Sequence, residues 1–233
     1  MIGIIAGTGF HDLGFLGEAA DKTVKTPYGE ACAMSGKGFL FIQRHGKDRS
    51  TPPHMLNHKA NIYAFKAEGI SSVIALTSVG SMRKSIPPRS IVIPDDYMQF
   101  SMIPTYNDVK ALHVTPGLDE DLRKRIISAA QKLKIKVLPR GVYLQTIGPR
   151  LETKAEINLF KNYADVVGMT MGSEATLAKE IGIKYAAISL VDNYAHGIGN
   201  APLDFTQVVK ASAAQREGLR MIIKELIEQS DRT

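Results

Sequence analysis

The sequence has a single cysteine, Cys32, so no disulfide can form within the chain. No apolar run approaches the ~18 residues that a membrane-spanning helix needs. The first residues, MIGIIAGTGF, lack the basic start and the cleavage site of a secretory signal peptide. Together these absences predict a cytoplasmic protein with no membrane partner.

The excess of charge of one sign is small. The chain carries 29 Lys and Arg against 23 Asp and Glu, which gives a net charge of +6. A dense basic cluster, LRKRI, falls in segment 119–133, where apolar residues recur at helical spacing, so we expect its charges on the solvated face of a helix. That apolar stripe consists of Leu122, Ile126, Ala129 and Leu133. A basic balance suits an anionic small substrate, and we expect no nucleic-acid partner.

Short apolar runs alternate with helical patterns along the 233 residues. The apolar runs predict strands at 2–7, 39–43, 72–78, 90–94, 141–146, 165–170 and 184–191. The helical patterns predict helices at 57–69, 119–133, 153–162, 173–182 and 204–229. Such alternation is typical of an α/β sandwich with a central mixed, largely parallel β-sheet flanked by helices. No linker or composition break divides the chain, so we expect a single domain over residues 1–233.

Polar residues stand at the ends of several predicted strands, where ligands gather in sheets of this kind. They are Thr8, Arg44, His45, Thr77, Ser78 and Thr170. One polar strand end would reflect only the usual polarity of loops. Several together indicate convergence on an anion.

The segment GTGFHD after the first strand does not match a dinucleotide fingerprint, because the third glycine would fall at Asp12. A P-loop is excluded too, since no Gly-Lys-Ser/Thr follows. The amides of this turn and the Thr8 hydroxyl could hold a single phosphate. A plain tight turn is an equal alternative at this point. Arg44 adds a planar fork that suits a phosphate.

Two further residues raise questions of their own. In RLETKAE, Thr153 and Glu156 have the spacing of a capping box, which assigns Glu156 to a helix start. Glu152 is left without a local partner, so it is either a solvated group or a carboxylate that reaches into a site. Asn193 follows an apolar run that we expect to stop before Asp192, and it either closes a turn or recognises a ligand, because an amide both donates and accepts.

Several motifs together are similar to those of one family. They are GTGF, TPYG (26–29), RHG (44–46), NHKANI (57–62), TSVGS (77–81), GPR (148–150) and VGMT…E…LAKE (167–180). On these residues the chain resembles the trimeric purine nucleoside phosphorylase superfamily nearly end to end. It resembles most closely the methylthioadenosine phosphorylase branch with its methylthioinosine relatives.

The resemblance implies the nucleoside phosphorylase fold and reversible phosphorolysis, with inorganic phosphate as co-substrate and no metal or organic cofactor. Matched motif by motif, the phosphate contacts would be Thr8, Arg44, His45, Thr77, Ser78 and Thr170. Met169 matches a methionine under the sugar, and His113 matches a histidine that a neighbouring subunit supplies to the 5′ side. The family further implies a homotrimer or a dimer of trimers.

The base site departs from the adenine-using branch, where TDYD or SDYD ends the strand. Here the residues are Asp192, Asn193, Tyr194 and Ala195, so Asn193 replaces the first base-facing aspartate and Ala195 the second. Glu152 matches a glutamate of the 6-oxopurine phosphorylases. Opposite a 6-oxopurine, asparagine can donate to O6 or N7 while Glu152 accepts from N1–H. An aspartate opposite O6 would leave buried acceptors unpaired, at a free-energy cost of ~1–3 kcal/mol. Because the leaving purine gathers negative charge, we expect Asn193 and Glu152 to be catalytic.

The 5′ side is matched by Phe205, beside a predicted capping box of Asp204 and Gln207. An aromatic ring there suits a methylthio group better than a hydroxyl. The sequence therefore predicts a 5′-methylthioinosine phosphorylase that also accepts inosine or guanosine. The alternatives are a methylthioadenosine phosphorylase, a nucleosidase that uses water, and a non-enzymatic phosphate or nucleotide sensor.

Overall fold

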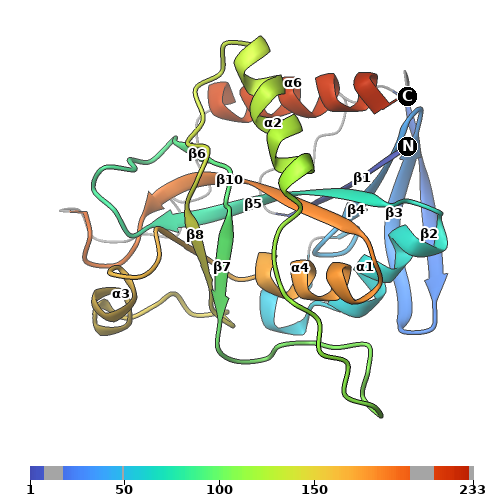
Figure 1. The fold of residues 1–233 in the computed structure, drawn as a ribbon, viewed down its shortest axis with the longest axis horizontal. Coiled ribbons are helices and arrows are strands. Elements are labelled where there is room, and N and C mark those ends of the chain that lie inside the picture. Colours follow the sequence, from blue (N-terminus) through green and yellow to red (C-terminus); the bar gives the residue numbers. More distant parts are fainter. Residues whose placement is uncertain (8–17, 49, 200–212, 231–233) are drawn as a thin grey trace.

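The computed structural model describes residues 1–7, 18–48, 50–199 and 213–230. A mixed sheet forms the centre, and helices cover both of its faces (Figure 1). The strand order is β2 (Ala19–Thr26), β3 (Gly29–Gly36), β4 (Phe39–Gln43), β1 (Ile2–Ala6), β5 (Ser72–Ser81), β9 (Val166–Gly168), β8 (Val142–Gln145) and β7 (Asp96–Gln99). Strand β10 (Lys184–Tyr194) pairs with β5 and with the short β6 (Ile91–Val92).

The pairing in this sheet is mixed. Strand β1 is parallel to β4 and β5, β10 is parallel to β5, and β8 is parallel to β7 and β9. Antiparallel pairs join β2 to β3, β3 to β4, β5 to β9 and β6 to β10. The predicted α/β fold with a central mixed sheet is confirmed.

Two apolar clusters lie on the two faces of the sheet. Helices α2 (Glu120–Lys132) and α6 (Ala213–Ser230) cover one face, where Ile126 and Leu219 pack on Ile74 and Ile188. Helices α1 (His58–Ala67) and α4 (Met171–Glu180) cover the other face, where Ile62 and Ala175 belong to the second cluster. Figure 1 shows these helix pairs on opposite sides of the long strands β5 and β10. Helix α3 (Lys154–Phe160) lies apart and buries Ile157 in a third, smaller cluster.

The predicted strands are all present, but β2, β3 and β7 were missed. Strand β2 reads AADKTVKT and buries only Val24, so it lacks the continuous apolar run by which the other strands were recognised. Strand β10 was predicted to end before Asp192, and this was wrong, because it continues to Tyr194. Its pairing with β5 shifts register between Val191 and Asn193, so Asp192 is an extra residue in the ladder. Such a β-bulge re-aims the side chains around it.

The prediction that the charges of LRKRI are all solvated was wrong for Arg123. Its side chain is buried, and Nε donates to the Pro94 carbonyl oxygen at 2.6 Å while Nη2 donates to that of Pro139 at 2.5 Å. The guanidinium therefore ties α2 to the loops around β6 and β8. No helix in the described ranges has the length and apolarity that crossing a membrane requires.

Candidate active site

An unpaired stretch of β5 marks the place where several strand ends meet. On one edge of β5, β1 pairs with Val73–Leu76 and β9 pairs with Gly80 and Ser81. Between them, no strand of the described part of the chain pairs with residues 77–79 on that edge. The carboxyl ends of β1 and β4 reach this gap from one direction, and the end of β9 reaches it from the other, because β9 is antiparallel to β5. This topology brings the residues after three strands together.

Arg44, which follows β4, is buried in an ion pair with Glu174 of α4. Its Nε donates to Glu174 Oε1 at 2.5 Å and its Nη2 donates to Oε2 at 3.1 Å. Burial alone would lower the pKa of Arg44, but the Glu174 charge and hydrogen bonds raise it above its usual value. Tyr185 Oη also donates to Glu174 Oε2, at 2.8 Å, and burial followed by the Glu174 charge raises the pKa of this tyrosine. The guanidinium is thus fixed within the site and stays charged.

His45, the next residue, lies beside Gly7 at the end of β1. Its Nδ1 is 2.8 Å from the carbonyl oxygen of Thr51, which can only accept, so the ring proton is on Nδ1. Burial lowers the pKa of His45 more than this hydrogen bond raises it, so the ring is neutral at pH 7. A Cβ on Gly7 would lie 2.7 Å from His45 Nε2. The absence of a side chain at Gly7 therefore leaves Nε2 facing the backbone of Gly7.

A second histidine, His58, lies at the first turn of α1 and was not among the predicted site residues. Its Nδ1 is 3.9 Å from Glu174 Oε1 and has no hydrogen-bond partner within the described residues. Burial lowers its pKa to about 4, although the Glu174 charge opposes this shift. His58 is therefore neutral at pH 7, and Arg44 carries the charge that neutralises Glu174.

Thr77 and Ser78, both predicted phosphate contacts, lie on opposite faces of β5, because side chains alternate along a strand. Thr77 is buried, with Oγ1 2.8 Å from Ser189 Oγ of β10. Ser78 Oγ donates to Oδ2 of Asp192, the bulged residue. The structure therefore does not bring the two hydroxyls together, and each is hydrogen-bonded across to β10.

Thr170 and Met169 follow β9, at the end that meets the gap in β5. Thr170 is the N-terminal cap residue of α4, yet its side chain makes no capping hydrogen bond, and its backbone N–H donates to Tyr143 Oη at 3.3 Å. Met169 packs against Gly148 so closely that a Cβ there would lie 2.5 Å from its sulfur. Thr170, whose side chain also hydrogen-bonds Tyr143, thus lies at the start of a helix, where anions are favoured.

Asn193, Tyr194 and Ala195 lie at the end of β10, beside Gly80. Asn193 Nδ2 donates to the Tyr194 carbonyl oxygen at 2.7 Å, and the described residues offer its amide no other partner. Tyr194 Oη donates to the Lys84 carbonyl oxygen at 3.2 Å, while Ala195 is buried and its N–H bonds to Ser81. The second N–H and the oxygen of the Asn193 amide therefore remain for a ligand.

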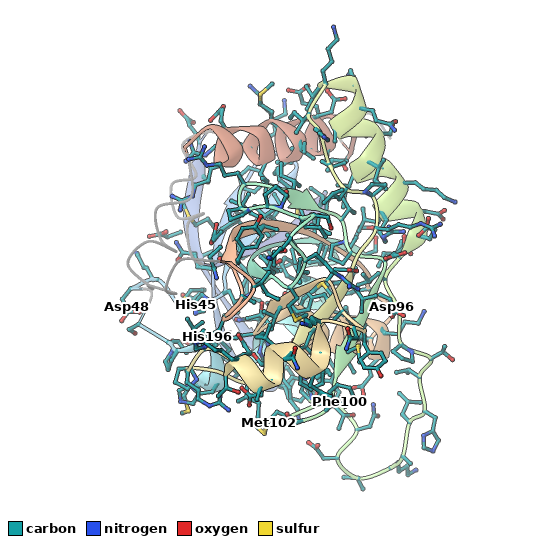
Figure 2. All side chains as sticks on the ribbon, turned by 90° about the vertical axis from the view of Figure 1, so that its left-hand side faces the viewer. His45, Asp48, Asp96, Phe100, Met102 and His196 are labelled. Atoms are coloured by element: carbon teal, nitrogen blue, oxygen red, sulfur yellow. The ribbon has the colours of Figure 1, made fainter. Side chains whose placement is uncertain are left out.

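Glu152 lies in the loop before α3 and is nearly buried, with 8% of its surface exposed. Oε1 accepts from Thr146 Oγ1 at 2.6 Å, and the described residues provide no donor to Oε2. The capping box of Thr153 and Glu156 is confirmed. His196, three residues beyond Asn193, approaches the Glu152 backbone oxygen to 3.2 Å through Nδ1. This contact holds the Glu152 loop beside the end of β10. Figure 2 shows His196 on the same side of the molecule as His45.

Two cavities adjoin these residues. One of about 440 Å³ lies beside Met169 and is lined by Met55, His58, Met102, Ile147 and Ser173 as well. The other, of about 310 Å³, is lined by Glu152, Thr146, Phe100, Arg150 and Phe160. In the described ranges, no three or more His, Cys, Asp and Glu side chains form a group that could hold a metal ion.

Three predicted residues do not join this cluster. Thr8 and Phe205 lie outside the described residues, and so does the predicted capping box of Asp204 and Gln207. His113 is exposed, on the long segment between β7 and α2. Glu174, Tyr185 and His58 were missed, because sequence spacing gives no sign that they meet Arg44. Glu174 is the glutamate within VGMT…E…LAKE, and that motif was the one available signal.

A family model described as the Phosphorylase superfamily matches residues 1–228. The chain therefore belongs to the phosphorylase superfamily. The family predicted from the motifs is confirmed. Over 229 residues the chain is 46% identical to a "Probable 6-oxopurine nucleoside phosphorylase" of Archaeoglobus fulgidus, covering 95% of this chain and 94% of the relative.

Other similar proteins are named for related activities. A "Probable S-methyl-5'-thioinosine phosphorylase" of Thermodesulfovibrio yellowstonii is 39% identical, covering 97% of this chain and 90% of its own. An "S-methyl-5'-thioadenosine phosphorylase" of Hyperthermus butylicus is 36% identical, covering 97% and 87%. The solved methylthioadenosine phosphorylase of Schistosoma mansoni in complex with adenine superposes with a TM-score of 0.91 over 100% of this chain and 92% of its own. At 24% identity that superposition shows the shared fold.

Proposed function

We propose that this chain cleaves 6-oxopurine nucleosides by phosphorolysis, with 5′-methylthioinosine as its best substrate. The products are the free purine and 5-methylthioribose 1-phosphate. Curated relatives named for 6-oxopurine nucleosides or methylthioinosine, at 36–46% identity over nearly the full length, support this assignment. Inosine and guanosine are expected as secondary substrates.

The observation that carries the proposal is the pairing of Glu152 with the end of β10. Glu152 is a nearly buried carboxylate with Oε2 open, and the His196 contact holds its loop beside Asn193. Hypoxanthine presents an N1–H donor and an O6 acceptor, which match a carboxylate and an amide N–H. As the purine leaves it gathers negative charge, so both hydrogen bonds strengthen in the transition state.

The phosphate would bind beside the unpaired residues 77–79 of β5. Arg44, with one free N–H on Nη1, follows β4, and Thr170 stands at the start of α4, so both lie where β1, β4 and β9 end. As the C1′–N9 bond breaks, the sugar becomes oxocarbenium-like, and the phosphate oxygen that stabilises this cation then bonds to C1′. We infer that this reaction needs no metal and no organic cofactor, since the anion is both nucleophile and counter-charge.

The 5′ group is assigned from the larger cavity. Met55, Met102 and Met169 line it together with Ile147, and thioether side chains adapt well to an apolar sulfur-bearing group. Polar side chains such as His58, Gln145 and Ser173 line the same cavity, so the preference for a methylthio group rests on the thioether contacts alone. This favours methylthioinosine over inosine.

A panel of three nucleosides tests the substrate order. The purified chain with saturating phosphate should show a higher kcat/KM for methylthioinosine than for inosine, and methylthioadenosine should be the poorest. One missing methylthio contact is worth about 10- to 200-fold in an apolar pocket. Faster turnover of methylthioadenosine than of methylthioinosine would contradict the assignment and favour the adenine-using alternative.

We also propose that the chain assembles as a homotrimer or a dimer of trimers. The segment between β7 and α2 projects from the body (Figure 1), and Figure 2 places Phe100 and Met102 at the lower margin near its start. Its exposed apolar residues are Phe100, Met102, Ile103, Val109 and Leu112, with Val109 95% exposed. Apolar exposure on this scale marks an interaction surface, and His113 of this segment would complete the site of the next subunit.

Subunit mixing tests this arrangement. A His113→Ala chain mixed with a Glu152→Ala chain should regain part of the activity that each lacks, because some sites then combine an intact His113 with an intact Glu152. The control is each variant mixed with itself. A fully active monomer in sedimentation would contradict the proposal.

A further inference from the structure

The ion pair of Arg44 and Glu174 is buried and hydrogen-bonded to several neighbouring groups. Glu174 is fully buried, and 2% of the Arg44 side chain is exposed. Both carboxylate oxygens of Glu174 accept from the guanidinium, and Tyr185 Oη holds Oε2 in place from β10. The carboxylate is therefore held from β10 as well as by Arg44.

The guanidinium has five N–H bonds to direct. Nε and one N–H of Nη2 go to Glu174, and Nη2 also lies 3.4 Å from the Ile5 carbonyl oxygen of β1. Nη1 donates to the Leu76 carbonyl oxygen of β5 at 3.0 Å. This leaves one N–H, on Nη1, without a partner in the described part of the chain. A Cβ on Gly7 would lie 3.1 Å from Nη1, so this nitrogen lies beside Gly7.

We propose that Glu174 is a positioning residue, which occupies the fork of Arg44 so that a single N–H faces the bound phosphate. The inference rests on the proposed function, because it assigns the strand-end site to phosphate. It changes how the anion is bound: Arg44 contributes one directed hydrogen bond from a neutralised pair, in place of a bidentate clamp. His45, which is neutral, adds no charge, so the anion is held mainly by directed donors.

Stability alone is a weak explanation for this pair. A buried ion pair carries a desolvation cost that often cancels its attraction, and apolar replacements are commonly as stable. The geometry has a further consequence that an apolar pair would lack, since it fixes one N–H beside Gly7 and Leu76. A donor fixed in this way needs no reorganisation when the substrate binds.

Glu174→Asp is the most direct test, because it keeps the charge and shortens the side chain by one methylene. The carboxylate can then no longer reach both nitrogens, and Arg44 loses its fixed orientation. We expect the KM for phosphate to rise by about 10- to 100-fold, with the KM for the nucleoside changed less than about twofold. Tyr185→Phe, which removes one of the two donors to Oε2 and leaves that from Arg44, should raise the phosphate KM by a smaller factor. If Glu174→Asp fails to fold, Tyr185→Phe carries the test alone.

The matched control is Asp165→Asn, in the ion pair of Arg83 and Asp165, whose Nε–Oδ1 distance is 2.9 Å. This pair lies at the opposite end of β9 from Thr170, so its loss should lower the melting temperature and leave the phosphate KM unchanged. Glu174 variants that behave like this control, or that raise both KM values equally, overturn the inference while the proposed function stands. Wild-type base release that is equally fast without phosphate overturns both.

Discussion

The Arg44 side and the Asn193 side of the site differ in how completely the protein pairs its own polar groups. Glu174 has partners on both oxygens, and all but one N–H of Arg44 are engaged. On the other side, Glu152 keeps Oε2 open, and Asn193 uses one N–H on the neighbouring Tyr194 carbonyl oxygen. Under the proposed function, the first side is built before the phosphate arrives, and the second side is completed by the base. A changed residue should therefore affect stability and phosphate binding on the first side and the choice of nucleoside on the second.

The largest effect is expected from Asn193→Asp, which changes hydrogen bonding with almost no change in volume. Opposite O6 it removes a donor and adds a charge, so the ratio of kcat/KM for methylthioinosine to that for methylthioadenosine should fall by about 10³-fold and at most ~10⁴-fold. Activity on methylthioadenosine should hold or rise, because a carboxylate accepts from N6–H. Since Glu152 remains, we expect a partial switch.

Asn193→Leu serves as the steric control for that variant. It removes all hydrogen bonding at similar size, so both substrates should lose activity together. If Asn193→Asp also lowers both equally, Asn193 acts through the turn after β10 and the account of the base site fails.

Arg44→Ala should have the largest effect on stability, because it leaves Glu174 buried without its counter-charge. The expected loss of unfolding free energy is about 3–5 kcal/mol in urea denaturation. Arg83→Ala, in the part-exposed pair with Asp165, should cost less than about 1 kcal/mol. A loss for Arg44→Ala as small as for Arg83→Ala would contradict the contrast between the two sides.

A double variant sharpens this result. Arg44→Met combined with Glu174→Leu removes both charges and fills the space with apolar groups, so most of the stability should return. The phosphate KM should stay far above that of the wild type, because the directed N–H of Arg44 is still absent. Recovery of phosphate binding along with stability would show that the pair serves folding alone.

His58 provides a pH-dependent test of the same side. Its pKa is about 4 in the folded chain, below its usual value, because burial disfavours the imidazolium; Glu174, Arg44 and His45 are the charged and titratable groups nearby. Between pH ~6.5 and 4 the unfolded chain protonates this histidine and the folded chain does not. The free energy of unfolding is therefore highest above pH ~6.5 and falls as the pH falls towards 4. The loss should be about 2–3 kcal/mol. His58→Gln, which does not titrate, should lose less than wild type between pH 7 and 4.5, and equal losses in the two proteins would contradict the assignment.

The smallest effect is expected at Asp192. Burial raises the pKa of its carboxyl, although the Ser78 hydrogen bond and Arg216 oppose the shift, and Oδ1 is buried without a partner among the described residues. A raised pKa means that the folded state holds the proton more tightly, so stability falls as the pH rises through that pKa. Asp192→Asn should therefore gain about 1 kcal/mol at pH 7 and nothing near pH 3.5. A less stable variant at pH 7 would show that the charge is needed there.

Strand and helix patterns were predictable because they follow from local periodicity. The apolar runs that became β1, β4, β5 and β10 are nearly continuous in the sequence. Strand β2 escaped because its charged residues are solvated and only Val24 turns inward. A local pattern also cannot show a bulge, so the end of β10 was placed too early.

The site was predictable where a motif carries chemistry in adjacent residues. Arg44, Glu152 and Asn193 were predicted in this way, and the structure places all three near the strand ends. The partners of Arg44 were not, because Glu174 is 130 residues away in the sequence and Tyr185 belongs to another strand. Their meeting depends on the antiparallel pairing of β9 with β5, which no local pattern reveals. Arg123 was likewise predicted to be solvated, because its hydrogen bonds to the carbonyl oxygens of Pro94 and Pro139 join segments far apart in the sequence or in separate loops.

The most direct test of the account is the release of hypoxanthine from methylthioinosine by the wild-type chain, measured with and without inorganic phosphate. Phosphorolysis predicts release only when phosphate is present, with one equivalent of 5-methylthioribose 1-phosphate formed for each hypoxanthine. Release at the same rate in phosphate-free buffer, with the free sugar as product, would contradict it and identify a nucleosidase.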